Sequence, residues 1–136
     1  MGWLVNQMSS RMDAVMSAEL KPLDLDIRFF ANLMSLLIED DLSQTELGRR
    51  VGEPQYTTSR IIDALQDRGL VERRRDPNSR RAHRIALTRK GKELALQLPP
   101  VIQRVNSQVL ERLDKHEQQE LLRLLGKALG VDDPAR

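Results

Sequence analysis

Apolar residues recur at steps of three and four along most of the chain, which is the spacing of one face of an α-helix. Residues 2–20 carry such a stripe, and Pro22 ends the helix that it predicts. A second helix is expected from about Asp26 to Ile38. Because this second helix is apolar almost all round, it should be the central buried element. The stripe of the first helix consists of Val5, Met8, Met12, Val15, Met16 and Leu20.

Residues 43–69 predict two short helices joined by a tight turn. Ser43 followed three residues later by Glu46 is a capping-box start, and Gly52 with Pro54 separates the two helices. The second helix has one apolar face and ends at Gly69. That face consists of Thr58, Ile61, Ile62 and Leu65. The stretch therefore has the form of a helix-turn-helix motif.

A pair of short strands is expected after this motif. Residues 71–75 are too few and too charged to form a helix alone, and the following Asp-Pro-Asn-Ser sequence favours a turn. Ile85 and Leu87 alternate with polar or small neighbours, as in a half-buried strand. The two strands would enclose a polar, arginine-rich loop.

The C-terminal third predicts two further helices. Thr88 caps a helix that begins near Arg89, with a bend expected at Pro99 and Pro100. A last helix starts with Asp114 and is rich in leucine. Leu94, Leu98, Ile102, Val105 and Val109 form a seam suited to a partner helix. Both chain ends carry more apolar surface than a small unit can cover, so we expect a homodimer.

Positive charge is concentrated in the central third of the chain. The whole chain has a net charge of +2, but residues 43–92 hold thirteen Lys and Arg against six Asp and Glu. This stretch is therefore at +7, and the remainder is at −5. A cluster of positive charge on a motif is typical of a nucleic-acid-binding protein.

The outer face of the second motif helix has the chemistry to read DNA. Tyr56, Ser59 and Arg60 point away from the core in its first two turns, whereas Asp63 and Asp67 occupy the same face later. The N-terminal half could meet phosphates and base edges, while the two aspartates would be repelled. Helix-turn-helix proteins use their recognition helix in this way.

Other classes of function have little support in the sequence. The absence of cysteine excludes disulfides and cysteine-based metal sites. No phosphate loop or nucleophile elbow is present, and His83 and His116 lie far apart, so we expect no enzyme activity, cofactor or metal. The acidic run of residues 39–41 is interpreted as a solvated helix end. No long apolar segment suggests a membrane span or a leader, so a cytoplasmic location is expected.

The chain resembles the MarR family of winged helix-turn-helix transcription regulators over nearly its whole length. The resemblance rests on S-Q-T-E-L-G-R-R-V-G, on D-A-L-Q-D-R-G-L-V-E-R, and on D-P-N-S-R-R followed by I-A-L-T-R-K-G. It implies a mainly α fold with a small β-wing, in one domain spanning residues 1–136. Residues 23–88 would form the winged helix-turn-helix DNA-binding lobe, and residues 1–22 and 89–136 would hold the N- and C-terminal dimerisation helices. It also implies a homodimer on inverted-repeat, double-stranded DNA, and many members are repressors released by small aromatic or lipophilic molecules.

The resemblance assigns DNA-binding residues by position. In the motif these are Ser43, Gln44, Thr45, Gln55, Tyr56, Thr57, Ser59 and Arg60, of which the last five would face the major groove. Arg80 and Arg81 would lie on the wing near the minor groove. The run of residues 73–75, which includes Arg74, could be a solvated strand end, but because it lies just before the turn with Arg80 and Arg81 we expect it to touch phosphates. Ser79 stands where the family commonly has aspartate, so the salt bridge that often steadies the wing is missing.

The effector and two alternatives remain open at this point. The ligand site is unknown, with Trp3, Met8, Met12 and Phe30 as candidate residues. The motif could instead serve protein association, through Tyr56 and Arg60, although its charge of +7 argues against that. The chain could also be a DNA-binding regulator without a small-molecule effector.

Overall fold

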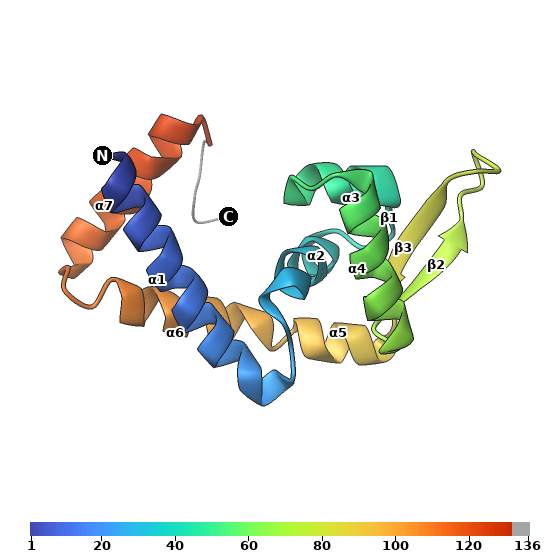
Figure 1. Ribbon diagram of the computed structural model, residues 1–136, viewed down its shortest axis with the longest axis horizontal. Coiled ribbons are helices and arrows are strands. Elements are labelled where there is room, and N and C mark those ends of the chain that lie inside the picture. Colours follow the sequence, from blue (N-terminus) through green and yellow to red (C-terminus); the bar gives the residue numbers. More distant parts are fainter. Residues whose placement is uncertain (132–136) are drawn as a thin grey trace.

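A computed structural model describes residues 1–131, which form seven α-helices and a small sheet at one side of the molecule (Figure 1). The first part of the chain forms α1 (Gly2–Leu20), a short 3-10 turn (Lys21–Leu23), α2 (Ile27–Ile38), β1 (Leu42–Ser43), α3 (Gln44–Val51) and α4 (Gln55–Asp67). The second part forms β2 (Val71–Arg75), β3 (His83–Leu87), α5 (Arg89–Ala95), α6 (Leu98–Val109) and α7 (Lys115–Leu129). This is the mainly α fold with a β-wing that the sequence predicts.

The helix α2 is the central element, as expected. The side chain of Asp26 caps it by accepting a hydrogen bond from the Arg28 N–H, at 2.9 Å. It packs against α1, α3, α4, α5 and β3, and Leu33 and Leu36 on it are completely buried. Not all of its apolar residues are buried, since Ile38 at its C-terminal end is 74% exposed.

The helix α6 packs along α1 of the same chain (Figure 1). Leu98, Val105 and Val109 of the predicted seam are buried in this single chain. Polar contacts tie the two helices as well, since Glu19 accepts hydrogen bonds from Arg104 and Gln108, each at 2.7 Å. The partner helix of this predicted seam is therefore α1 of the same chain.

The predicted long helix after Thr88 is divided in two. The chain leaves α5 at Leu96 and enters α6 at Leu98, with a proline in the first turn of α6, so the expected bend is a break between two helices. Thr88 caps α5 as predicted, accepting from the Gly91 N–H at 3.0 Å. Gly91 itself is required by space, because a Cβ there would lie 1.8 Å from the carbonyl oxygen of Leu70.

The sheet has one strand more than the sequence predicts. The strands β2 and β3 pair as an antiparallel hairpin from Val71–Leu87 to Arg75–His83, and β1 pairs with the other edge of β3. The order is therefore β1-β3-β2. Because β1 contains only two residues, no alternating pattern could reveal it.

The two chain ends leave apolar surface uncovered. The last helix, α7, starts with a complete capping box between Asp114 and Glu117, as predicted. Leu124, Leu125 and Leu129 on it are at least 45% exposed, and Trp3 on α1 is 70% exposed. A groove of about 490 Å³ between α1 and α7 is lined mainly by apolar side chains.

Candidate nucleic-acid interface

The two faces of α4 are those that the periodicity predicts. Thr58, Ile61, Ile62 and Leu65 are buried against the core. On the opposite face, Tyr56 is 71% exposed and Arg60 is exposed, while Thr57 and Ser59 are partly exposed. Among residues 1–131, the guanidinium of Arg60 has no hydrogen bond or ion pair with another side chain. A free cation therefore lies in the second turn of the helix, where a recognition helix meets DNA.

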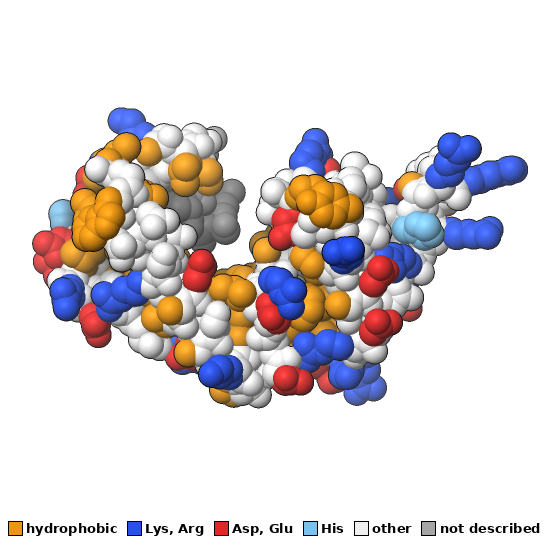
Figure 2. Space-filling view, in the orientation of Figure 1, with side chains coloured by type: hydrophobic (Ala, Val, Ile, Leu, Met, Phe, Trp, Pro, Cys, Tyr) orange, Lys and Arg blue, Asp and Glu red, His pale blue; other side chains and the backbone are white. Residues whose placement is uncertain are grey.

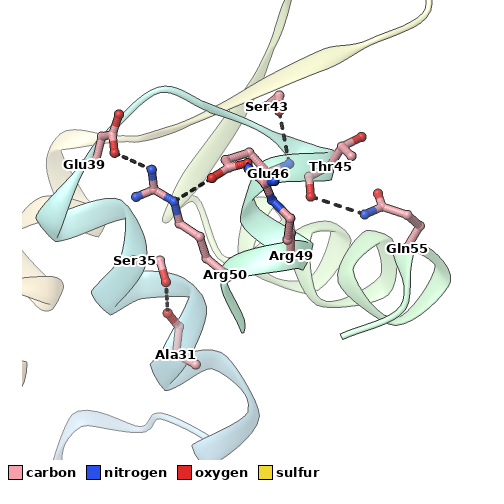
Figure 3. Close-up of polar contacts among 9 residues, drawn as sticks. All are labelled: Ala31, Ser35, Glu39, Ser43, Thr45, Glu46, Arg49, Arg50 and Gln55. Atoms are coloured by element: carbon pink, nitrogen blue, oxygen red, sulfur yellow. Dashed lines mark hydrogen bonds and ion pairs between the residues drawn. The ribbon is translucent and has the colours of Figure 1, made fainter. Parts of the chain in front are cut away.

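Close packing between α3 and α4 sets the position of Gln55. A Cβ on Gly48 would lie 2.8 Å from both Gln55 Nε2 and Thr58 Oγ1, so a glycine is needed where the helices cross. Thr58 donates its hydroxyl to the carbonyl of Pro54 at 3.2 Å, which satisfies a buried polar group at the start of α4. Gln55 donates to the Thr45 carbonyl at 3.5 Å (Figure 3). Its amide therefore lies over the N-terminus of α3.

The beginning of α3 and the turn end of the hairpin enclose a common hollow of about 190 Å³. Five of the sequence-predicted residues line it, namely Ser43, Gln44, Thr45, Gln55 and Arg81. Ser43 also caps α3, accepting from the Glu46 N–H at 3.1 Å. The structure thus brings residues from three separate segments to one surface.

The expected capping box of α3 is only half formed, because Glu46 has other partners. Its carboxylate pairs with Arg49 and Arg50, and the Arg50 Nε–Glu46 Oε1 distance is 3.0 Å (Figure 3). Hydrogen bonds from Arg50 and then Arg49 lower the pKa of Glu46, so it stays charged. Arg50 also pairs with Glu39 at the end of α2. This network fixes α3 to α2.

The acidic run of residues 39–41 ends α2 and is largely exposed, as interpreted, but each of its side chains also has a partner in the fold. Glu39 pairs with Arg50 of α3. Asp40 accepts a hydrogen bond from the Leu87 N–H at 2.9 Å, where β3 extends beyond β1. Asp41, in the left-handed region with φ 57°, pairs with Arg84 at 3.2 Å. The run therefore ties the α2–β1 connection to both α3 and the sheet.

The hairpin separates free arginines from paired ones. In the described residues, the side chains of Arg75, Arg80 and Arg81 form no hydrogen bond or ion pair, and Figure 2 shows Lys and Arg side chains projecting from the end of the hairpin. Arg74 instead donates to Glu72 at 2.9 Å, and this hydrogen bond is the main cause that raises its pKa. A phosphate contact by Arg74 stays a prediction. Unlike Arg75, Arg80 and Arg81, Arg74 already has an ion-pair partner, Glu72.

Arg73 lies on the opposite face of the strand and was not singled out from the sequence. Its guanidinium is turned toward α4 and pairs with Asp63 at 2.6 Å, so it differs from the expectation that the whole run touches phosphates. A signal was present, because alternation along β2 places it on the face of buried Val71.

The side chain of Ser79 stabilises the hairpin turn. Its hydroxyl accepts hydrogen bonds from the N–H groups of Arg81 and Ala82, at 3.4 and 3.2 Å. Asp76 accepts from the Asn78 N–H at 2.9 Å and bounds the same turn. The serine therefore steadies the backbone that carries Arg80 and Arg81.

The four candidate ligand residues do not share one cavity. Met8 and Met12 line the groove between α1 and α7, whose lining includes neither Trp3 nor Phe30. Phe30 is partly buried against the central core.

Among residues 1–131, no helix is both long and apolar enough to cross a membrane.

The sequence and the fold of this chain are similar to those of known proteins. A sequence profile of the MarR family matches residues 30–82. A MarR family protein of Mycobacterium tuberculosis, solved in complex with salicylic acid, is 30% identical over 94% of this chain and 95% of its own, with a TM-score of 0.76. A mutant of MarR from E. coli, solved in complex with operator DNA, is 26% identical over 94% of this chain and 92% of its own, with a TM-score of 0.87.

A third similar structure is a MarR transcriptional regulator of Methanosarcina mazei, 25% identical over 95% of this chain and 86% of its own, with a TM-score of 0.85. All three structures match both the helix-turn-helix region and the helices on either side of it. The chain belongs to the MarR family of winged helix-turn-helix, DNA-binding transcription regulators.

Proposed function

We propose that this regulator is a homodimeric repressor that binds an inverted-repeat operator and is released by a small-molecule effector. The observation that carries the proposal is the placement of the free arginines. Arg60 lies in the second turn of α4, and Arg75, Arg80 and Arg81 lie at the end of the hairpin. The N-terminal end of α4 and the tip of the hairpin lie on the same side of the molecule (Figure 1), so one duplex can meet both.

The two elements suit different grooves of that duplex. The first turns of α4 offer Gln55, Tyr56 and Arg60 to base edges in the major groove, where each base pair has its own pattern of donors and acceptors. Arg80 and Arg81 are permanently charged and sit on an exposed turn, which suits the narrow, negative minor groove beside it. Ser43, Gln44 and Thr45 would add contacts to the DNA backbone from the N-terminus of α3.

Dimerisation follows from the uncovered helices at the chain ends. We assign residues 1–22 and 89–136 to a dimerisation platform, of which residues 132–136 lie outside the described part, and residues 23–88 to the DNA-binding lobe. The apolar side chains of α1 and α7 would be covered by the same helices of a second copy. A two-fold axis would then present two copies of α4 about 34–36 Å apart, one turn of B-DNA, which matches an inverted repeat.

Repression and release follow from the same arrangement. A dimer that covers one turn of DNA at a promoter excludes polymerase by occupying its site. A ligand wedged between the platform and a lobe would change the separation of the two α4 helices, and a differential affinity of a few kcal/mol would shift the population away from the DNA-bound form. The relative from M. tuberculosis binds salicylic acid, so an aromatic acid of this kind is the first effector to test.

The test starts from DNA selected by the protein out of a random pool. The selected site is placed across a promoter, and transcript is measured with and without the protein and with salicylate. We expect transcript to fall when the protein is present and to recover with the effector. An increase in transcript would contradict repression. If no aromatic acid restores transcript and none shifts the melting temperature of the protein, the chain is a regulator without an effector of this class.

A further inference from the structure

Arg73 occupies an unusual position for an arginine in the hairpin. It lies on β2 opposite Ile85, on the face that packs against α4, and only 19% of its side chain is exposed. Its two neighbours along the strand, Glu72 and Arg74, are exposed and pair with each other. Arg73 is therefore turned inward, between the hairpin and the DNA-reading helix.

One guanidinium joins three elements of the lobe. From β2, Arg73 Nη1 lies 2.6 Å from the Asp63 carboxylate and donates to Gln66 Oε1 at 2.9 Å, both on α4. Nη2 donates to the backbone carbonyl of Ser59, also on α4, at 3.2 Å. Nε donates to Gln44 Oε1 on α3 at 3.4 Å. The four partners come from elements that are adjacent only in the folded lobe.

The partners on α4 form a single stripe that faces the hairpin. Ser59, Asp63 and Gln66 are at positions i, i+4 and i+7, so they lie one above another on the helix. A planar guanidinium that meets three points along this stripe fixes both the distance and the angle of the strand against the helix. Lysine could not do so, because its ammonium is a single point charge on a flexible stem.

A tilt of the hairpin at Arg73 would displace the arginines at its far end. Arg81 and Arg80 are four and five residues from Ile85, the partner of Arg73, so they lie at most about 15 Å along the hairpin at 3.3 Å per residue. A tilt of about 10° at the base would then move these arginines by about 2–3 Å, which is enough to break a hydrogen bond of about 2.9 Å. The positions of Arg80 and Arg81 relative to α4 therefore depend on how firmly the base is held.

We propose that Arg73 is a positioning residue for DNA recognition, which locks the hairpin to α4 so that the two elements bind DNA as one unit. This inference rests on the proposed contacts of α4 and the hairpin with DNA. It predicts that Arg73 contributes through the hairpin arginines, without touching DNA itself.

Charge masking is the competing explanation for the same contacts. Asp63 lies on the outer face of α4, and Arg73 neutralises a carboxylate that would otherwise repel phosphates. If masking were the whole role, removing the carboxylate with Asp63→Asn would make Arg73 dispensable. If positioning is the role, Asp63→Asn would not restore binding, because the hairpin would still be free to tilt.

The experiment is a double-mutant cycle on the full chain, with binding to the selected operator measured by fluorescence anisotropy. Arg80→Ala with Arg81→Ala is introduced into the wild type, into Arg73→Met and into Arg84→Met. Arg84→Met is the matched control, because Arg84 is also an ion-paired arginine of this sheet but its partner is Asp41 on the α2–β1 connection. Circular dichroism identifies a temperature at which each variant is folded.

We expect the hairpin pair, Arg80→Ala with Arg81→Ala, to weaken operator binding about tenfold or more in the wild type and in Arg84→Met, because two cations no longer reach the DNA. In Arg73→Met the same two substitutions should weaken operator binding about threefold or less, since the effects of coupled residues do not add. Should Arg73→Met fail to fold, Arg73→Lys keeps the charge and the aliphatic stem, and it should abolish the coupling in the same way.

Two results would overturn the inference. One is an undiminished cost of the hairpin pair in the Arg73 variants. The other is wild-type affinity in the variant that combines Arg73→Met with Asp63→Asn, which would reduce Arg73 to a charge mask. A wild-type chain that does not prefer its selected DNA over random DNA would instead contradict the proposed function, so the two failures are distinguishable.

Discussion

Replacing Leu121 and Leu125 with Glu should abolish the dimer without altering a DNA-facing residue. Ten apolar side chains in residues 3–12 and 122–131 are 38% to 76% exposed in the single chain, which amounts to about five whole side chains. At about 2 kcal/mol for each side chain covered, two protomers would gain about 20 kcal/mol at most. Association costs about 4–15 kcal/mol, so a stable dimer has a modest surplus. Four buried carboxylates at several kcal/mol each would exceed that surplus.

Sedimentation velocity at micromolar concentration measures this directly. The double variant should sediment as a monomer or as unfolded chain, because Leu121 also packs against the core, and its affinity for the operator should fall because the two half-sites are no longer bound together. Ile38→Glu is the matched control, since Ile38 is 74% exposed on α2, outside the platform helices, and this variant should remain dimeric. A double variant that stays dimeric and binds its operator normally would refute the assignment of α1 and α7 to the interface.

Three further predictions follow from individual side chains. Arg60→Ala should cost about 1–3 kcal/mol of operator affinity and relax the preference at one base pair in each half-site, as measured by anisotropy on single-base variants of the operator. Arg80→Ala with Arg81→Ala should reduce the slope of log affinity against log salt by about one for each phosphate that is no longer neutralised. Hydrogen bonds from Arg104 and then Gln108 lower the pKa of Glu19 below 4.5, so its contribution to stability is present above about pH 4.5 and disappears as the pH falls through the lowered value. The melting temperature of Glu19→Gln should therefore lie below that of the wild type at pH 7 and approach it in acid.

Each of these predictions can fail in a specific way. An equal loss of affinity on operator and random DNA would reassign Arg60 to a phosphate contact. An unchanged salt slope would show that the hairpin arginines do not reach DNA. A difference between Glu19→Gln and the wild type that persists undiminished at pH 3 would mean that the ion pair with Arg104 is not its source.

Features that depend on neighbouring residues were predictable from the sequence. The buried face of α4 follows from the spacing of Thr58 and Ile62, because helical periodicity alone decides which side chains share a face. The caps at Ser43, Thr88 and Asp114 depend only on residues within one turn. The outward position of Arg60 is predictable for the same reason.

Features that depend on contacts between distant segments were not predictable in this way. Periodicity shows that α6 has an apolar seam around Val105, but it cannot say whether α1 or a partner chain covers it. The arginines of β2 look alike in the sequence, yet Arg73 contacts Gln44, which is 29 residues away, while Arg75 has no partner among residues 1–131. The acidic run is an exposed helix end as interpreted, but the ion pair between Asp41 and Arg84 joins residues 43 positions apart, so the sequence could not show it.

The spacing of the two half-sites in DNA selected by the protein tests the central claim most directly. Selection from a random pool, followed by sequencing and footprinting of the best sites, gives both the bound sequence and its symmetry. A two-fold dimer that reads DNA through α4 should select an inverted repeat whose half-site centres are about 10–10.5 base pairs apart, protected on one face of the duplex. Selected DNA with a single unpaired half-site, or with no enriched sequence at all, would contradict it.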